Sequence, residues 1–260
     1  MQHFVTDGSN QKLNKCLTTY NKLVYNIDMK FQDISITIDN KELLKNFSKV
    51  IAPGETVVVI GPNGCGKSTF AHGIMGRGDI AVEGSIQLNN KEITDMETFE
   101  RSQEGIFVSW QTPPELPGVS TFGLIKEIKD IKSKDIGKEL KEYKNILNEV
   151  GLSEDWTTRP VNVGGSGGER KRAELSNLLT LQPQCAILDE IDTGLDSNGL
   201  RLVVDVINNR KERNLSTILI THNINTVQNL DYDYGLMFEK GKLIEVNSDT
   251  VEQKLKDGYD

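Results

Sequence analysis

Several features that would assign a protein to a specialised class are scarce in this sequence. Its 260 residues contain three cysteines, Cys16, Cys65 and Cys185, which lie far apart and form no C-x-x-C pair. This spacing gives neither a disulfide framework nor a self-contained zinc or iron–sulfur site. A reducing compartment fits it best.

Positive charge is also in short supply. The chain has 30 Lys and Arg against 38 Asp and Glu, a formal net charge of −8. Neutralising a nucleic-acid backbone needs clustered cations in excess. We therefore expect no nucleic acid as the main partner.

Long apolar runs are missing as well. None approaches the roughly 18 residues that span a bilayer, and the N-terminus lacks the apolar core of a secretory signal. We expect a cytoplasmic protein without membrane insertion. Residues 1–22 are predicted to be a polar, mobile leader, and 23–260 a single domain with an ordinary apolar fraction of 37%.

What the sequence does contain is an α/β pattern. Compact β-branched or apolar runs, typical of strands buried on both faces, are interleaved with helical patterns, which predicts a largely parallel sheet; the runs are "TVVVI" (56–60), "GIFVSW" (105–110), "CAILD" (185–189) and "STILIT" (216–221). Three short segments between 24 and 55, "VYNIDMKF", "DISITID" and "FSKVIAPGE", predict antiparallel strands.

A helical insertion is predicted at roughly 98–180. Apolar residues recur there at three- and four-residue spacing and give one helix an apolar stripe, better explained as subdomain core than as a partner groove; they are Ile136, Leu140, Tyr143, Ile146, Leu147 and Val150.

The first candidate site is the stretch "GPNGCGKST" (61–69), directly after the buried strand. It matches G-x-x-x-x-G-K-[ST], in which glycines let backbone N–H groups converge on the β- and γ-phosphates of a nucleotide. Lys67 supplies a cation and Ser68 offers a hydroxyl to Mg²⁺. The predicted nucleotide-binding residues are Gly61, Pro62, Asn63, Gly64, Cys65, Gly66, Lys67, Ser68 and Thr69.

The strand "CAILD" delivers the acids that such a loop needs. Asp189 at its end is predicted to hold Mg²⁺, directly or through water. Glu190 points elsewhere and is predicted to orient or deprotonate the water that attacks the γ-phosphate.

Three more polar residues follow strands or open helices. Gln111 could reach the metal or the attacking water, and His222 would lie at the carboxyl edge of the sheet, where ligands of open α/β sheets collect. Asp196 in "TGLD" could simply cap the next helix.

A second glycine-rich loop, "GGSGGERKR" (164–172), also looks suited to an anion, although a complete phosphate loop already lies upstream. The complete order of motifs resembles the nucleotide-binding domain of ABC ATPases, from about Phe31 to the C-terminus. That resemblance implies a P-loop domain with a RecA-like mixed sheet, an antiparallel β subdomain and an inserted α-helical subdomain. It also implies a head-to-tail homodimer formed on ATP binding, in which this signature loop closes on the partner's nucleotide. Its residues there would be Ser166, Gly167, Gly168 and Glu169, together with Asp196.

Within the family, the sequence is most similar to the ATPases of the Suf iron–sulfur cluster assembly system. The likeness lies in "EGIFVSWQTPPELPGVS", "RPVNVGGSGGERKRAE", "CAILDEIDTGLDSNGL" and the ending "DGYD". It implies a Mg²⁺-dependent ATP hydrolase, with Lys67, Gln111, Glu190 and His222 as catalytic residues and Ser68, Gln111 and Asp189 at the metal. The implied partners are scaffold proteins of the SufB and SufD type.

Some positions depart from the family pattern. Gly165 stands where an apolar side chain is usual, which would loosen the loop, and Glu169 replaces Gln. Ile38 aligns with an adenine-stacking aromatic, so base recognition should be apolar and weak. Cys65 replaces Ser, and at a helix N-terminus its pKa is expected to be lowered.

Two other functions stay open at this stage. One is the ATP-binding subunit of a membrane ABC transporter, coupled to a permease through residues 111–131. The other is an ATP-switched interaction protein without catalysis, against which Glu190 and His222 argue.

Overall fold

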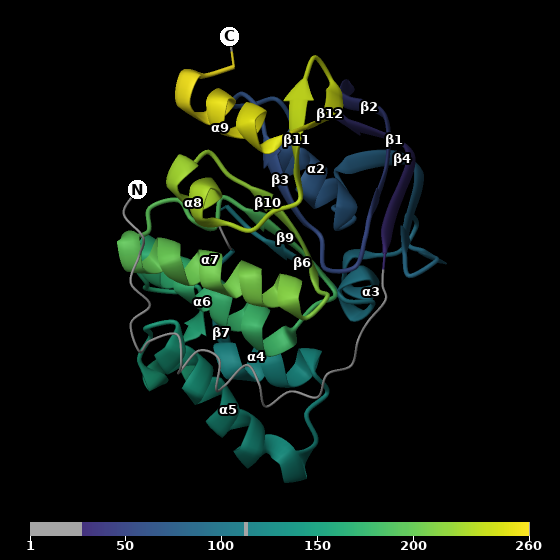
Figure 1. Ribbon diagram of the computed structural model, residues 1–260. Coiled ribbons are helices and arrows are strands. Elements are labelled where there is room, and N and C mark those ends of the chain that lie inside the picture. The colour runs from purple at the N-terminus through teal and green to yellow at the C-terminus, as the bar shows by residue number, and fades with distance from the viewer. Residues whose placement is uncertain (1–27, 112–113, 260) are drawn as a thin grey trace.

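The structure, a computed structural model, describes residues 28–111 and 114–259. The predicted leader, residues 1–22, and Cys16 lie outside them. The chain forms a six-stranded sheet, a four-stranded sheet and a helical region (Figure 1).

The six-stranded sheet is the centre of the fold, with the order β12-β11-β3-β10-β9-β6. Five of its strands are parallel, and β12 pairs antiparallel with β11 at the edge. The bounds are β3 Thr56–Ile60, β6 Ile106–Ser109, β9 Cys185–Asp189, β10 Ser216–Ile220, β11 Tyr234–Glu239 and β12 Lys242–Val246. The four apolar runs identified in the sequence supply four of its five parallel strands, β3, β6, β9 and β10, as predicted.

The four-stranded sheet is antiparallel, as predicted, and has the order β2-β1-β4-β5. Its strands are β1 Met29–Ile38, β2 Lys41–Ile51, β4 Ile80–Leu88 and β5 Lys91–Glu92. Residues 29–31 of the first predicted segment and residues 33–38 of the second lie in one strand, β1. Its register with β2 shifts after Phe31, next to Asp33, which has a φ of 51°. This irregularity produces the break in the sequence pattern that suggested two strands.

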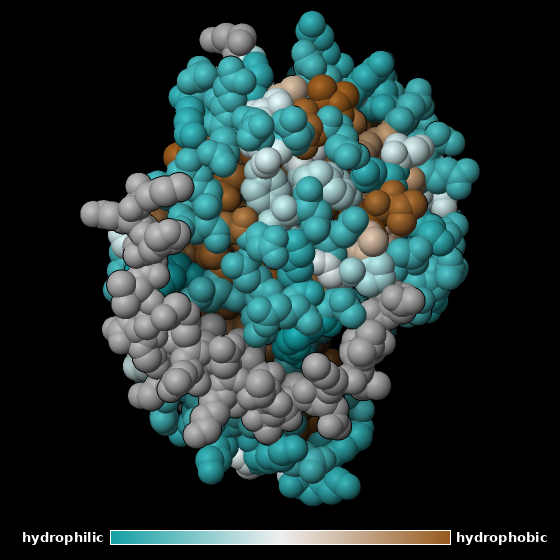
Figure 2. All heavy atoms as spheres, in the orientation of Figure 1, coloured by the Kyte–Doolittle hydropathy of each residue, from teal (hydrophilic) through white to brown (hydrophobic). Residues whose placement is uncertain are grey.

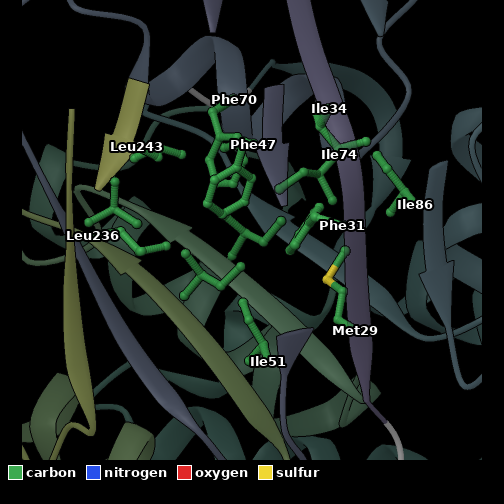
Figure 3. Packing of buried hydrophobic residues seen from close by; sticks show 14 of the residues in the cluster. Met29, Phe31, Ile34, Phe47, Ile51, Phe70, Ile74, Ile86, Leu236 and Leu243 are labelled. Carbon is green, nitrogen blue, oxygen red and sulfur yellow. The ribbon is translucent and has the colours of Figure 1, made fainter. Parts of the chain in front are cut away.

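Alternate residues of the central strands serve two different cores. In β3, Val57 and Val59 pack toward the antiparallel sheet, whereas Val58 and Ile60 pack toward the helices. This is why the strand reads as a continuous apolar run. Figure 3 shows the first core, where side chains of β1, β2 and β4 meet helix α2 (Lys67–Ile74) and strand β11.

Aromatic contacts join these elements. Phe70 of α2 lies with its ring centroid 5.8 Å from that of Phe47 and 6.2 Å from that of Phe238, both edge-on. The helix that follows the phosphate loop is therefore held against both sheets.

The helical region lies at the end of the molecule opposite α9 (Figure 1). It contains the segments α4 Thr121–Ile128, η1 Ser133–Asp135, α5 Ile136–Glu149, η2 Glu154–Thr157 and α6 Gly167–Leu181, and the small ribbon of β7 Leu116–Ser120 and β8 Pro160–Val161. The predicted stripe on α5 is core, because Tyr143, Ile146, Leu147 and Val150 are buried in the second cluster. Strand β6 falls inside the predicted insertion at 98–180 but belongs to the central sheet.

The remaining helices are α3 Thr98–Gln103, α7 Ser197–Glu212, α8 Ile224–Asn229 and α9 Ser248–Asp257. In the part of the chain described here, no helix has both the length and the apolar character to cross a membrane. The face seen in Figure 2 is largely hydrophilic, with separate smaller hydrophobic areas.

Candidate nucleotide-binding site

The predicted site residues follow the carboxyl ends of parallel strands. Gly61 follows β3, Gln111 comes two residues after β6, Glu190 follows β9 and His222 comes two residues after β10. Because these strands run in the same direction, their carboxyl ends meet at one edge of the sheet. Four distant parts of the sequence are brought together there.

The phosphate loop owes its course to glycines. A Cβ on Gly61, whose φ is 153°, would lie 2.8 Å from the Cβ of Phe238 and 2.9 Å from the Sγ of Cys65. Gly66, with a φ of 116°, is the N-cap of α2 and approaches Leu43. Both positions need a residue without a side chain.

Lys67 lies over this loop and is 6% exposed. Its Nζ donates to the carbonyl of Gly61 at 2.8 Å and to that of Pro62 at 2.9 Å. Burial lowers the pKa of Lys67, while Cys65, Glu190 and Asp189 oppose that shift. A cation held this way can turn from two carbonyls to a phosphate with little rearrangement.

Asp189 ends β9 and is completely buried. Neither of its carboxylate oxygens has a hydrogen-bond partner of good geometry among the described residues. Burial raises its pKa, and the Ser68 hydroxyl lies close enough to oppose that shift. A buried, unpaired carboxylate beside a hydroxyl suits an oxygen-preferring cation such as Mg²⁺.

A preformed cage of protein ligands is absent from residues 28–111 and 114–259, where no three His, Cys, Asp or Glu side chains cluster to hold a metal. Mg²⁺ in nucleotide sites typically binds one or two protein groups and takes its other ligands from phosphates and water. The pair of Ser68 and Asp189 therefore fits this ion.

Glu190 has a backbone conformation that few non-glycine residues adopt, with a φ of 50°. Its N–H donates to the carbonyl of Ile220 at 2.9 Å, which ties it to the neighbouring strand. Its Oε2 accepts from Gln111 Nε2 at 2.8 Å. Its Oε1 lies 3.5 Å from His222 Nε2, too far for a good hydrogen bond.

The His222 ring has a pKa below its usual value, first because it is partly buried and second because Lys67 is near. A neutral imidazole can both accept and donate a hydrogen bond. Gln111, Glu190 and His222 thus form one polar group at the mouth of the loop.

These residues surround a cavity of about 700 Å³. Its lining includes predicted residues of all four segments, namely Asn63, Gly64, Gly66, Lys67, Ser68, Thr69, Gln111, Glu190 and His222. Leu43 and Thr193 also line it and were not predicted. Ile38 is not in the lining; its side chain packs against the first core, so Leu43 is the apolar residue available to an adenine base.

The predicted pKa of Cys65 is wrong in direction. Burial raises the pKa of this thiol, and this effect exceeds the lowering by Lys67. Its Sγ packs close to Gly61 and lies 4.0 Å from Lys67 Nζ. The helix N-terminus lowers a thiol pKa only where water and donors reach the sulfur, and here the first core covers much of it.

The signature loop lies apart from this cavity, since the lining includes none of residues 164–169. Ser166 is the N-cap of α6 and is exposed. It forms a capping box with Glu169: the Ser166 hydroxyl accepts from the Glu169 N–H at 3.3 Å and donates to Glu169 Oε2 at 2.8 Å. A Cβ on Gly167 would meet nothing within 4 Å, and one on Gly168 only the edge of Leu195 and Gly194.

Gly165 lies against a buried side chain. A Cβ there would lie 2.8 Å from Cη2 of Trp156, a side chain that is 1% exposed. The buried indole occupies the space that a side chain at this position would need. The departure from the family pattern therefore has a packing explanation.

Asp196 performs the simpler of its two predicted roles. Its carboxylate accepts from the Gly199 N–H at 2.8 Å and caps α7. It also accepts from Arg172 Nη2 at 3.0 Å, which holds the start of α7 against α6.

Two further contacts were missed because nothing local in the sequence marks them. Thr221 Oγ1 donates to Asp192 Oδ2 at 2.6 Å and joins the loop after Glu190 to the one carrying His222. The ring of Tyr259 stands edge-on to His222, 6.5 Å between centroids, and its pKa is raised mainly by burial while the Gly61 N–H opposes the shift. The ending "DGYD" was noted only as part of a resemblance.

Comparison with known proteins agrees with this geometry. The profile of the ABC transporter family matches residues 44–193. That range runs from β2 through the phosphate loop and the signature loop to Thr193, and it covers more than half of the chain.

Individual relatives match over nearly their whole length. The chain is 31% identical over 240 residues to the probable ATP-dependent transporter SufC of Escherichia coli, covering 89% of this chain and 97% of that protein. It is 33% identical to vegetative protein 296 of Bacillus subtilis, covering 89% and 92%. It is 33% identical to the probable ATP-dependent transporter ycf16 of Antithamnion sp., covering 92% and 98%.

Solved structures share the fold. A nucleotide-free ATP-binding cassette from an ABC transporter superposes with a TM-score of 0.69 at 24% identity, covering 89% of this chain and 96% of that one. The ADP conformation of another such cassette gives 0.68 at 22% identity, covering 90% and 96%.

Proposed function

Since this chain belongs to the ABC transporter family and is an ATP hydrolase of the SufC-like kind, we propose that it drives conformational change in an iron–sulfur cluster scaffold. It dimerises head to tail on binding ATP and Mg²⁺. The main support for a dimer is that Ser166 is exposed and lies apart from the cavity of its own chain.

The chemistry assigned to the cavity is positioning and electrostatics. Lys67 and the N–H groups of the loop bind the β- and γ-phosphates. Ser68 and Asp189 would hold Mg²⁺, which would supply positive charge to the phosphates. Leu43 contacts the base.

Water is managed by the group at the mouth of the cavity. Glu190 orients or deprotonates the attacking water, and the hydrogen bond from Gln111 fixes its carboxylate. His222, whose pKa is lowered by burial and by Lys67, donates from its neutral ring to a γ-phosphate oxygen or accepts from the attacking water. The unusual φ of Glu190 is maintained by its bond to Ile220, so the carboxylate is aimed before substrate binds.

The second half of each site comes from the other copy. Ser166, Gly167 and Gly168 lie at the N-terminus of a 15-residue helix, where N–H groups and the helix dipole favour an anion. For the Ser166 hydroxyl to reach a phosphate it must leave Glu169 Oε2. Asp196 and Arg172 keep the neighbouring loop in register with this helix.

The scaffold assignment rests on the likeness to SufC and on the sequence segments around Gln111 and the signature loop. We propose partners of the SufB and SufD type, in the cytoplasm. A cysteine-bearing scaffold would supply the ligands for a cluster, because, of the two cysteines in the described residues, Cys185 is buried and Cys65 lies in the phosphate loop.

The alternative is the ATP-binding subunit of a membrane transporter. Several relatives carry transporter names, and the exposed apolar side chains of Leu116, Val119 and Ile128 lie in the segment that would meet a permease.

Affinity purification under anaerobic conditions distinguishes the two. Glu190→Gln should bind ATP with negligible turnover and hold the complex together. We expect it to retain a soluble, cysteine-bearing scaffold. Retention of a polytopic membrane protein instead would favour the transporter, and normal hydrolysis by this variant would contradict the role of Glu190.

A further inference from the structure

The backbone of Trp110, the residue before Gln111, is gripped by two side chains of α6. Its N–H donates to Glu174 Oε1 at 3.0 Å, and its carbonyl accepts from Lys171 Nζ at 3.3 Å. Lys171 and Glu174 are three residues apart and therefore share one face of the helix. The backbone N–H and the backbone carbonyl of Trp110 are thus both bonded to side chains of one helix.

Both of these side chains are ionisable and buried. Lys171 is 8% exposed and Glu174 is 6% exposed, with 3.9 Å between Lys171 Nζ and Glu174 Oε2. Glu174 Oε2 has no hydrogen-bond partner in the described residues. Taking two charges out of water costs several kcal/mol per ion, and the attraction between them often fails to repay it. Stability alone does not explain the pair.

The side chain of Trp110 is held from the opposite direction. Its ring lies on the ring of His72, with 4.7 Å between centroids. His72 belongs to α2, the helix that begins at the phosphate loop. Trp110 is therefore fixed between the helix of the phosphate loop and the helix of the signature loop.

We propose that Lys171 and Glu174 are positioning residues for ATP hydrolysis, which fix the backbone of Trp110 so that Gln111 reaches Glu190. Since Ser166 is the N-cap of the same helix, a shift of α6 on closing over a partner's nucleotide moves Trp110 and with it Gln111. The proposal rests on the proposed roles of Gln111 and Glu190.

The first test compares Glu174→Ala with Glu174→Gln. The amide oxygen of Gln can still accept from the Trp110 N–H, whereas Ala cannot. We expect Ala to lower kcat about tenfold and to change the Kd for ATP less than about twofold, because small misplacements of a catalytic group are costly. Gln should keep kcat within about threefold of the parent.

Arg210→Met is the matched control. Arg210 is a buried cation that also holds backbone carbonyls, those of Pro183 and Ser216, at the opposite edge of the sheet. It should lower the midpoint of urea unfolding and leave kcat of the folded protein unchanged. If it lowers kcat as much as Glu174→Ala does, the effect at Glu174 is general loosening and the proposal is overturned.

The decisive measurement is a double-mutant cycle with Gln111→Ala. If Glu174 acts through Gln111, then Glu174→Ala should change kcat less than about twofold once Gln111 is gone. A full tenfold loss in that background overturns the proposal. The proposed role of Glu190 would still stand if Glu190→Gln were inactive, so the two failures are distinguishable.

A second variant covers the case in which Glu174→Ala does not fold. Lys171→Met combined with Glu174→Leu replaces the buried ion pair by apolar side chains, a change that often preserves or raises stability. We expect a folded protein with kcat lowered about tenfold, and unchanged kcat in it would overturn the proposal.

Discussion

The two glycine-rich loops of this chain make an instructive contrast. In the phosphate loop, Lys67 is buried and Gly61 is hemmed in by Phe238 and Cys65. In the signature loop, Ser166 is exposed and a side chain on Gly167 would meet only open space. The phosphate loop is packed against its own chain at Gly61 and Lys67, although Pro62 to Gly64 are exposed. The signature loop presents Ser166 and Gly167 outward beyond Gly165, which packs against Trp156.

The contrast shows what glycine is for in each case. Around Gly61 it allows close approach within the chain, and the loop is complete as it stands. A side chain at Gly167 would meet no other part of the chain, so contacts within the chain do not explain why glycine stands there. A ligand that approaches the loop from outside would require a residue without a side chain. The second copy that we propose, with a bound nucleotide, would present such a ligand.

The largest expected effect follows from removing Lys67, the cation of the phosphate loop. Lys67→Ala should weaken ATP binding about 100-fold or more, since a desolvated cation that meets a phosphate contributes several kcal/mol. Titration calorimetry measures it. Lys91→Ala, which removes an exposed lysine paired with Glu104, is the control and should bind normally.

The next effect concerns the packing of the signature loop against Trp156. Gly165→Leu should lower the free energy of unfolding by about 2 kcal/mol, because its side chain collides with the indole of Trp156. Urea unfolding of the single and double variants measures it. Adding Trp156→Leu should recover part of the loss, and strictly additive losses would contradict the collision.

A smaller effect concerns Glu174 of α6, the helix that follows the signature loop. Burial raises the pKa of Glu174 to about 7. A carboxyl whose folded pKa lies above its unfolded value makes the protein less stable as pH rises through that range. Between pH 6 and pH 8 the free energy of unfolding should fall by about 1 kcal/mol from this group, on the linkage relation. In Glu174→Gln this contribution should be missing, and an equal slope in both proteins would refute it.

The smallest expected effect concerns Tyr259, which lies beside the phosphate loop. Tyr259 stands edge-on to His222 and its phenol faces Gly61. Tyr259→Ala should lower kcat about threefold, or less than 1 kcal/mol in activation free energy. Tyr259→Phe keeps the ring and should lie between. Steady-state ATPase assays decide it, and a larger loss with Phe than with Ala would show that the ring is not what positions His222.

The sequence was informative wherever local pattern and chemistry coincide. The run "TVVVI" followed by "GPNGCGKST" specifies a buried strand and the loop after it, and parallel strands bring Gln111, Glu190 and His222 to the same edge. The antiparallel sheet was predicted from alternation, although the irregularity near Asp33 made one strand look like two.

Long-range packing was beyond its reach. The hydrogen bond between Trp110 and Glu174 joins residues 64 apart, and the ring contact of Tyr259 brings the last described residue to His222. Burial caused the error at Cys65, because the helix N-terminus is a local feature and the cover over the sulfur is not. The sequence did not predict the contact of Gly165 with Trp156 either, because those residues are neighbours only in the fold.

The pairing of two copies is tested most directly by the mass of Glu190→Gln in solution with ATP and Mg²⁺. Light scattering after gel filtration should give about twice the 29.0 kDa of one chain. Adding Ser166→Arg places a bulky side chain on the signature loop, where it would prevent a second copy from docking. This change should return the mass to that of one chain while ATP still binds. A single-chain mass for Glu190→Gln with ATP bound, or a dimer indifferent to Ser166→Arg, would contradict the account.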